Sequence, residues 1–157
     1  MWRVFQFKLI KGTKSLFPME LPHDRQIYTH PIEVSSHDID ELNHVNNVVY
    51  VQWIQDAAAA HWNSRTDEKT RSSNGWVVLR HEIDYKDAAR LESQVVAYTW
   101  VGETAGPKSV RHVIICDAVT KKIMVEAKTT WCLIDPVTQK PKRITQQLDD
   151  LIKVVKR

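Results

Sequence analysis

The chain has 157 residues, of which 43% are hydrophobic and 26% are charged, and these proportions indicate one ordinary globular domain. Its net charge of +3 is too weakly basic to indicate a nucleic-acid partner, but it is compatible with an anionic, phosphate-bearing substrate. The two cysteines, Cys116 and Cys132, lack the CxxC spacing, so we expect buried thiols, no disulfide and a reducing, cytoplasmic location.

The first twenty residues are basic and aromatic, with no acidic side chain before Glu20. Lys8 interrupts the apolar run WRVFQFKLI, which argues against a secretory signal peptide. No run of the chain approaches the ~18 apolar residues that a membrane span requires. We predict an accessory extension over residues 1–20, with organelle targeting or membrane-surface binding as the alternative, and one domain over residues 21–157.

The next segment, residues 26–36, alternates apolar and polar side chains and predicts a half-buried strand. Pro31 cannot donate a hydrogen bond to a neighbouring strand, so it favours the edge of a sheet or a bulge.

A long buried helix is predicted next, because apolar or small residues recur on one helical face at Tyr50, Trp53, Ile54, Ala57, Ala58 and His61. Asn46 or Asn47 supplies its N-cap. The preceding turn therefore directs Asp40 and His44 toward a helix N-terminus, where free N–H groups could polarise a carbonyl oxygen.

The rest of the chain predicts a solvated loop, four strands and a final helix. The loop follows Trp62, has no apolar side chain and ends at Gly75. The strands span 76–85, 91–101, 109–117 and 123–135, and Val77, Leu79, His81, Ile83 and Tyr85 are assigned to one face of the first. Short turns favour antiparallel pairing, and residues 144–157 have helical spacing. The order predicts an α+β fold, a sheet wrapped around one buried helix.

The turn and helix start, DIDELNHVNNVVY over residues 38–50, resemble the D-x-D-x-x-G-H-V-N-N-x-x-Y signature of the 4-hydroxybenzoyl-CoA thioesterase family of hotdog-fold proteins. Plant acyl-ACP thioesterases carry a similar stretch. Three positions depart from these patterns: Asn43 replaces a Gly, Ala88 a common Pro, and Leu42 an Asn of the plant enzymes. The resemblance covers roughly residues 26–148 and is closer to the single-domain acyl-CoA type. It implies a hotdog fold, with about five antiparallel strands around one long helix and a C-terminal helix.

The resemblance also implies an activity. It predicts an acyl-CoA thioesterase of fatty acid metabolism, which releases a carboxylic acid and CoA without a cofactor, working as a homodimer or homotetramer. In the family the second Asp of the signature is the nucleophile or base, which falls on Asp40, and the oxyanion donor is a backbone N–H that falls on Asn47. His44 would hydrogen-bond substrate or water. An acyl-ACP thioesterase and a hotdog protein that binds acyl thioesters without hydrolysing them are the alternatives.

Each of these residues also has a structural interpretation. Asp40 could cap the turn, His44 could anchor it, and Asn46 could be the helix cap as well as a substrate contact. Tyr50, the second predicted substrate contact on the helix, could simply belong to the core. Lys86 and Arg90 are the leading candidates for the phosphates of the carrier, followed by three further basic residues near turns or strand ends: Arg111, Lys121 and Lys122.

Two other classes of site are weaker. His37, Asp38, Asp40 and His44 have metal-binding side chains, but no further His or Cys pair has metal-ligand spacing, so we predict no metal. The GxSxG, P-loop and GxGxxG motifs are absent from the sequence, so serine hydrolases, nucleotide hydrolases and Rossmann dehydrogenases lack their signatures.

Overall fold

The computed structural model describes residues 19–154, and the basic extension predicted over residues 1–20 lies almost entirely outside them. Five strands, three α-helices and one 3-10 turn follow one another along the chain: β1 (Tyr28–Ile32), η1 (Ser36–Asp38), α1 (Asn47–Arg65), α2 (Glu68–Ser72), β2 (Gly75–Tyr85), β3 (Val95–Ala105), β4 (Lys108–Asp117), β5 (Ile123–Ile134) and α3 (Gln146–Lys153).

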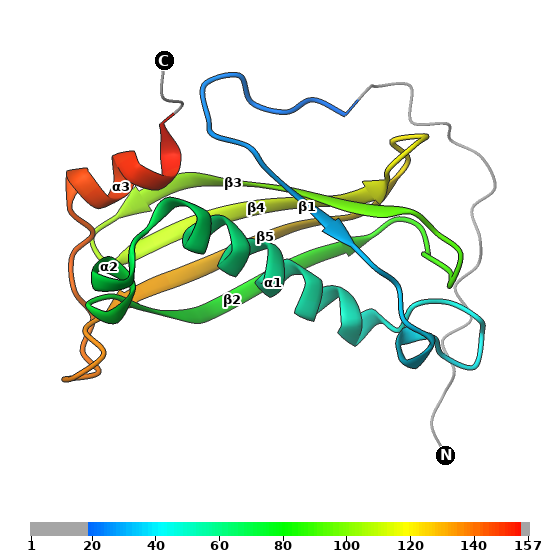
Figure 1. Ribbon diagram of the computed structural model, residues 1–157, viewed down its shortest axis with the longest axis horizontal. Helices are drawn as coiled ribbons and strands as arrows, with labels where there is room; N and C mark the ends of the chain where they lie inside the picture. Colours follow the sequence, from blue (N-terminus) through cyan, green and yellow to red (C-terminus); the bar gives the residue numbers. More distant parts are fainter. Residues whose placement is uncertain (1–18, 155–157) are drawn as a thin grey trace.

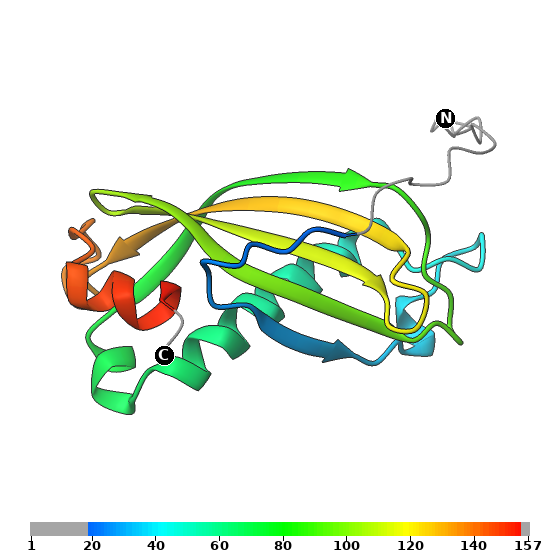
Figure 2. The same ribbon diagram turned by 90° about the horizontal axis from the view of Figure 1, so that it is seen from above.

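The strands form one antiparallel sheet in the order β1-β3-β4-β5-β2. The sheet curves around α1, which lies along one of its faces (Figures 1 and 2). The predicted order of strand, long helix and four antiparallel strands is confirmed, and the hotdog fold with it. β1 is an edge strand, in which Pro31 pairs with Val96 of β3, as Pro31 predicted.

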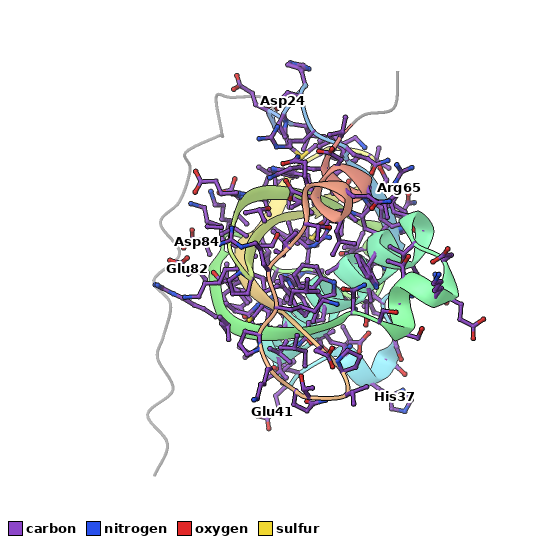
Figure 3. The ribbon with its side chains drawn as sticks, turned by 90° about the vertical axis from the view of Figure 1, so that its left-hand side faces the viewer. Asp24, His37, Glu41, Arg65, Glu82 and Asp84 are labelled. Carbon is purple, nitrogen blue, oxygen red and sulfur yellow. The ribbon has the colours of Figure 1, made fainter. Side chains whose placement is uncertain are left out.

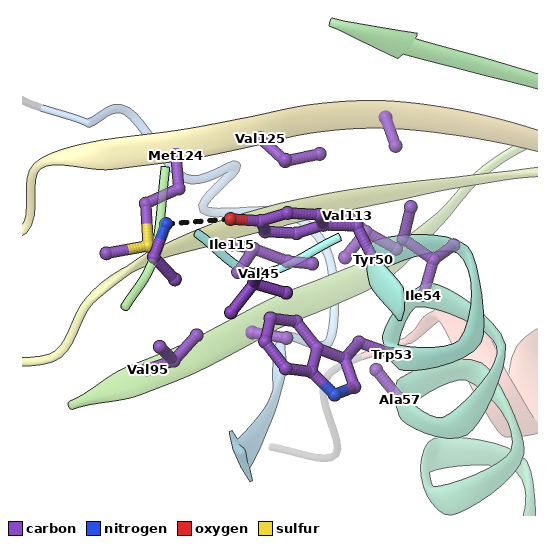
Figure 4. Close-up of a cluster of buried hydrophobic side chains, with 13 residues drawn as sticks. Val45, Tyr50, Trp53, Ile54, Ala57, Val95, Val113, Ile115, Met124 and Val125 are labelled. Carbon is purple, nitrogen blue, oxygen red and sulfur yellow. Dashed lines mark hydrogen bonds between the residues drawn. The ribbon is translucent and has the colours of Figure 1, made fainter. Parts of the chain in front are cut away.

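The buried face of α1 is the one that its spacing predicted. The residues of α1 that are buried are Tyr50, Trp53, Ile54, Ala57, Ala58 and His61. Of the two candidate caps, Asn46 is the N-cap, and its side-chain oxygen accepts from the Val48 N–H at 3.1 Å. The first core cluster lies between this face and the sheet, and Figure 4 shows Tyr50 and Trp53 among its valine and isoleucine side chains.

The segment after Trp62 differs from the predicted loop. α1 continues to Arg65, and Thr66 is buried, with its hydroxyl donating to the Trp62 carbonyl at 2.7 Å. A second, short helix follows, because the Asp67 carboxylate accepts from the Thr70 N–H and caps it. The lack of apolar side chains indicated exposure correctly, but local capping was enough to make part of the segment helical.

The predicted face of β2 is also wrong over part of its length. The pairing with β5 shifts register between Val78 and Arg80, so one extra residue enters the strand. An extra residue reverses the alternation of side chains. Val77 and Leu79 are therefore 40% and 52% exposed, whereas His81 and Ile83 are partly buried.

The end of the molecule next to α3 is closed by polar contacts. Arg65 Nε donates to the Leu151 carbonyl at 3.0 Å, and Thr104 donates to the Asp149 carboxylate at 2.6 Å. α3 is shorter than predicted and begins after its N-cap, Thr145. Cys116 and Cys132 are free and buried. Among the helices that the structure describes, none is long and apolar enough to cross a membrane.

Candidate active site

The turn between η1 and α1 is held by backbone hydrogen bonds. Ile39 and Val45 form an isolated antiparallel bridge, and within it the Asp40 N–H donates to the His44 carbonyl at 2.8 Å. The chain reverses at Asn43, whose φ of 58° lies in the left-handed region and whose N–H donates to the Asp40 carbonyl at 3.1 Å. Asn is one of the few residues besides Gly that adopts this conformation readily, so the turn accommodates the departure from the family signature.

The Asp40 side chain is engaged through one of its two oxygens. Oδ1 accepts from the Leu42 N–H at 2.9 Å and from the His44 N–H at 3.2 Å. Oδ2 has no hydrogen-bond partner within residues 19–154. The carboxylate is therefore oriented by the turn through Oδ1, and this half-buried group has its second oxygen available.

The first turn of α1 leaves one N–H available. The cap satisfies the Val48 N–H, and the Asn46 carbonyl accepts from the Val49 N–H at 2.9 Å. In the described part of the chain the Asn47 N–H has no acceptor, while the Asn47 carbonyl accepts from the Tyr85 hydroxyl at 3.1 Å. The free N–H stands at the positive end of the helix dipole, where it favours an oxyanion.

The segment after β2 supports both the turn and the helix. The Val45 N–H donates to the Ala89 carbonyl at 2.8 Å, and the Ala89 N–H donates to the Tyr50 hydroxyl at 2.8 Å, the bond dashed in Figure 4. Tyr50 is only 1% exposed, and burial raises the pKa of its hydroxyl. In this conformation Tyr50 anchors the segment, and its predicted contact with substrate stays a prediction.

These bonds bring Lys86 and Arg90 to the same end of the molecule as Asp40. Both are exposed, but Lys86 Nζ already forms a salt bridge with Glu126 at 2.7 Å. The β4–β5 turn reaches this end as well, because the Ala118 N–H donates to the Gln94 carbonyl and Lys122 pairs with Asp87.

Arg111, one of the residues predicted to contact a phosphate of the carrier, is not at the surface. Arg111 lies inside β4 and is only 6% exposed, so it cannot meet a carrier at the surface. Its position was misjudged because a strand interior was taken for a strand end.

The cluster that suggested a metal is dispersed around the turn. Asp38 completes the capping box of η1, in which its carboxylate accepts from the N–H of the N-cap Ser35 at 2.7 Å. His37 contacts Ser35 and is exposed. Figure 3 shows His37 and Glu41 at the periphery of the molecule. His44 is partly buried. Within the described residues no three or more His, Cys, Asp or Glu side chains are grouped in a way that could hold a metal ion.

Two supporting contacts of this site were missed by sequence reasoning. The Tyr85 hydroxyl bonds the first residue of α1 from 38 positions away, and Ala89 bonds Tyr50 from 39 positions away. Neither pairing follows a local spacing. The nearest signal was that Tyr85 ends a predicted strand just before the basic candidates.

Comparison with known proteins identifies the class to which this fold and turn belong. The family model of the acyl-ACP thioesterase C-terminal domain matches residues 22–133, more than two thirds of the chain, so the protein belongs to that family of hotdog domains. No curated protein sequence matches it.

Solved structures with the same fold include several thioesterases. A 1,4-dihydroxy-2-naphthoyl-CoA thioesterase from Synechocystis is 14% identical with a TM-score of 0.70, covering 80% of this chain and 95% of that chain. A thioesterase from Thermus thermophilus complexed with coenzyme A and Zn is 16% identical with a TM-score of 0.70, covering 79% and 90%. The 12:0-ACP thioesterase from Umbellularia californica is 16% identical with a TM-score of 0.67, covering 78% and 48%. At these sequence identities, the comparison shows that the folds are similar and no more than that.

Proposed function

We propose that this protein hydrolyses acyl thioesters, with coenzyme A as the first candidate carrier, and releases a carboxylic acid and a thiol. The observation that carries the proposal is the pairing of two free groups at one end of α1. These are the second oxygen of Asp40 and the N–H of Asn47, on a domain that belongs to a thioesterase family.

The chemistry requires both groups. The thioester oxygen would accept from the Asn47 N–H, which stabilises the negative charge that develops there as the carbonyl carbon is attacked. Asp40 would either attack that carbon through Oδ2 or remove a proton from an attacking water. The C–S bond then breaks and the thiolate leaves, taking up a proton to become the thiol. If Asp40 is the nucleophile, water then hydrolyses the acyl–Asp40 anhydride; if Asp40 is the base, the attacking water has already supplied the second oxygen of the acid, and the proton held by Asp40 passes to the thiolate. His44 and Asn46 are assigned to hydrogen bonds with substrate or water beside this centre.

The carrier would be held by cations at the same end. Arg90 is exposed and its guanidinium makes no hydrogen bond within the described residues, so it is the better candidate for a phosphate. Lys86 would first have to leave Glu126, a surface pair that contributes little stability.

We further propose that the protein assembles as a homodimer or a homotetramer. β2 is an edge strand of 11 residues that pairs only with β5 among the described strands. Its exposed Val77 and Leu79 provide apolar surface beside the free edge.

An acyl carrier protein is the second candidate carrier. The matching family model describes the acyl-ACP thioesterase C-terminal domain. Hydrolysis of the same acyl group from acyl-CoA and from acyl-ACP, compared by kcat/KM, distinguishes the two carriers.

The test is release of free thiol from aromatic, short-chain and long-chain acyl-CoAs and from acyl-ACP, by the wild type and by Asp40→Asn. The Asn side-chain oxygen can still accept from the Leu42 and His44 N–H groups, so the turn should keep its shape. We expect a loss of about 100-fold or more in kcat/KM, because an amide can act neither as base nor as carboxylate nucleophile.

Asp56→Asn is the matched control, because Asp56 is an exposed carboxylate of α1 whose only side-chain hydrogen bond within residues 19–154 comes from Gln52. It should hydrolyse like the wild type. If the wild type hydrolyses none of the substrates, or if Asp40→Asn is as active as Asp56→Asn, the proposed role of Asp40 is wrong. Tight acyl-thioester binding without turnover would instead favour the non-hydrolytic alternative.

A further inference from the structure

A cavity of about 270 Å³ lies at the opposite end of α1 from the Asp40 turn. α1 contributes Ala58, Ala59 and Trp62, and the remaining walls come from the sheet, α3 and the residue before β2: Asn74, Trp76, Val101, Ser109, Arg111, Trp131 and Ile152. Ala58 follows Asn47 by eleven residues, about 16 Å along a helix. The cavity is thus well separated from the candidate active site.

The space between the two sites is filled. Tyr50, Trp53, Ile54 and Ala57 are all buried on the helix face that runs from the turn toward the cavity. Ala59 at the rim is exposed, so the cavity reaches the surface beside α1. A ligand would therefore enter it without passing the Asp40 turn.

The floor of the cavity contains a cation without an acidic partner. Arg111 is 6% exposed, and its Nη1 donates to His61 Nδ1 at 2.9 Å and to the Thr99 hydroxyl at 3.2 Å. Throughout residues 19–154 no carboxylate forms a salt bridge with it. Burial lowers the pKa of Arg111 to about 10, so the side chain remains charged at neutral pH. A buried charge without a counter-charge is costly, and a bound anion would remove that cost.

His61 cannot supply the missing negative charge. It is fully buried, and burial together with Arg111 and Arg65 lowers its pKa to about 3, so the ring is neutral. Because Nδ1 accepts from Arg111, the proton is on Nε2, which donates to the Gln26 side-chain oxygen at 3.2 Å. His61 therefore orients the guanidinium without neutralising it.

Two further donors face the same cavity. Trp131 Nε1 is buried and has no hydrogen-bond partner in the described part of the chain. Ser109 is 5% exposed and also lines the cavity, so its hydroxyl is a second possible donor. Ser109 pairs directly with Trp131 across β4 and β5, and Arg111 is two residues further along β4, so all three lie on one face of the sheet. An unpaired buried donor costs about 1–3 kcal/mol, so this arrangement favours a ligand that accepts hydrogen bonds.

We propose that this cavity binds a small carboxylic acid with a short apolar tail. The carboxylate accepts from the remaining N–H groups of Arg111 and from Trp131 and Ser109. The apolar tail packs against Trp62, Trp76 and Ile152 of the wall. A cavity of about 150 Å³ can hold benzene, so a volume of about 270 Å³ suits a ligand of about ten non-hydrogen atoms. The inference goes beyond thioester hydrolysis and does not depend on it.

Octanoate and 1-octanol are the probes, because they share the alkyl chain and differ in the carboxylate. Titration of the full-length protein by calorimetry should show saturable binding of octanoate at one site per chain. We expect 1-octanol to bind at least about tenfold more weakly, because it leaves Arg111 unpaired. Arg111→Gln should weaken octanoate by about tenfold or more and leave 1-octanol nearly unchanged. Arg80→Gln is the matched control, since Arg80 is exposed on β2 and, among the described residues, its side chain pairs only with Glu82.

Ala59→Trp keeps the test decisive if Arg111→Gln does not fold. Ala59 is exposed at the rim, so a large side chain there should block both probes without disturbing the core. The inference is overturned if the wild type does not bind octanoate saturably, if 1-octanol binds equally well, or if inorganic phosphate displaces octanoate at equal concentration. The inference is also overturned if folded Arg111→Gln, or Ala59→Trp, binds octanoate as tightly as the wild type does. Octanoate binding by a protein that hydrolyses no thioester would leave this site intact and reject only the enzymatic proposal.

Discussion

The two ends of α1 favour nearby charges of opposite sign. At the N-terminal end the Asn47 N–H has no acceptor within residues 19–154, and the helix dipole favours negative charge there. Toward the C-terminal end the field has the opposite sign, and the nearby charges are Arg65 and the buried Arg111. One helix thus favours an oxyanion at its start, whereas at its other end an arginine supplies the positive charge that would attract an anion. The difference separates the proposed catalytic site at the surface from the proposed binding site in the interior.

The largest effect should come from Asn47→Pro, which removes the free N–H at the N-terminal end. Proline is well tolerated at the first position of a helix, and Asn46 already has the extended conformation (φ −62°, ψ 138°) that a residue before proline requires. We expect kcat to fall by about 10²–10³-fold with little change in thermal stability. Thiol release and circular dichroism measure the two effects.

Asn47→Ala is the control for that substitution, since it keeps the backbone N–H and removes only the side chain. It should retain most of the wild-type kcat. Equal activity of the Pro and Ala variants would show that the oxyanion is stabilised elsewhere.

The C-terminal end should respond most to pH. The pKa of His61 is about 3 in the folded protein and near 6.5 when the chain is unfolded, so the unfolded state binds more protons between these values. Its stabilising contribution is complete above pH 6.5 and is lost as the pH falls toward 3. Unfolding in urea should therefore give a free energy lower by up to about 2 kcal/mol at pH 5 than at pH 7.

His61→Gln should flatten this acid dependence. A glutamine can still accept from Arg111 and donate to Gln26, yet it does not titrate. Burial lowers the pKa values of His81 and His112 as well, so a smaller slope of the same sign should remain. An unchanged slope would mean that His61 is not the dominant titrating group.

A smaller effect is expected for Asn46→Ala, which removes the helix cap. The lost hydrogen bond to the Val48 N–H should cost about 1 kcal/mol, or about 2–4 °C in Tm for a chain of this length. Asn46→Asp retains an acceptor and should stay close to the wild type, so the pair distinguishes loss of the cap from loss of the amide. A loss of activity in both variants, at a temperature at which both remain folded, would favour the proposed substrate contact.

The smallest effect should follow Asn43→Gly, which restores the residue usual in the family signature. Glycine adopts a φ of 58° without strain but loses more backbone freedom on folding, so the two terms nearly cancel. We expect a change in unfolding free energy within about 0.5 kcal/mol by urea titration. Asn43→Ala should cost about 1 kcal/mol, because alanine is strained in this region. Equal stability of the Ala variant would show that the turn relaxes.

The sequence predicted the start and the buried face of α1 closely, because their signals are local. The spacing from Tyr50 to His61 defined the buried face, and the Asn pair defined the cap. The turn geometry at Asp40 and Asn43 also follows from residues within a few positions of one another.

The remaining features depend on pairings between distant residues. The extra residue at Leu79 can be recognised only from the pairing of β2 with β5. The burial of Arg111 depends on the packing of α1 over β4. Arg111 was therefore assigned to the carrier at the surface, and its contact with His61, 50 positions away, could not be anticipated.

The two borders of the sheet differ in a way that limits how copies of the chain can join. β1 is short and contains Pro31, which has no N–H to offer another strand, whereas β2 has 11 residues and no proline. Such a sheet has one edge strand, β2, that can pair with another copy. When two copies pair through β2, the edges of the joined sheet are the two β1 strands. Growth by strand pairing then stops at two chains, so such pairing cannot propagate into a fibre.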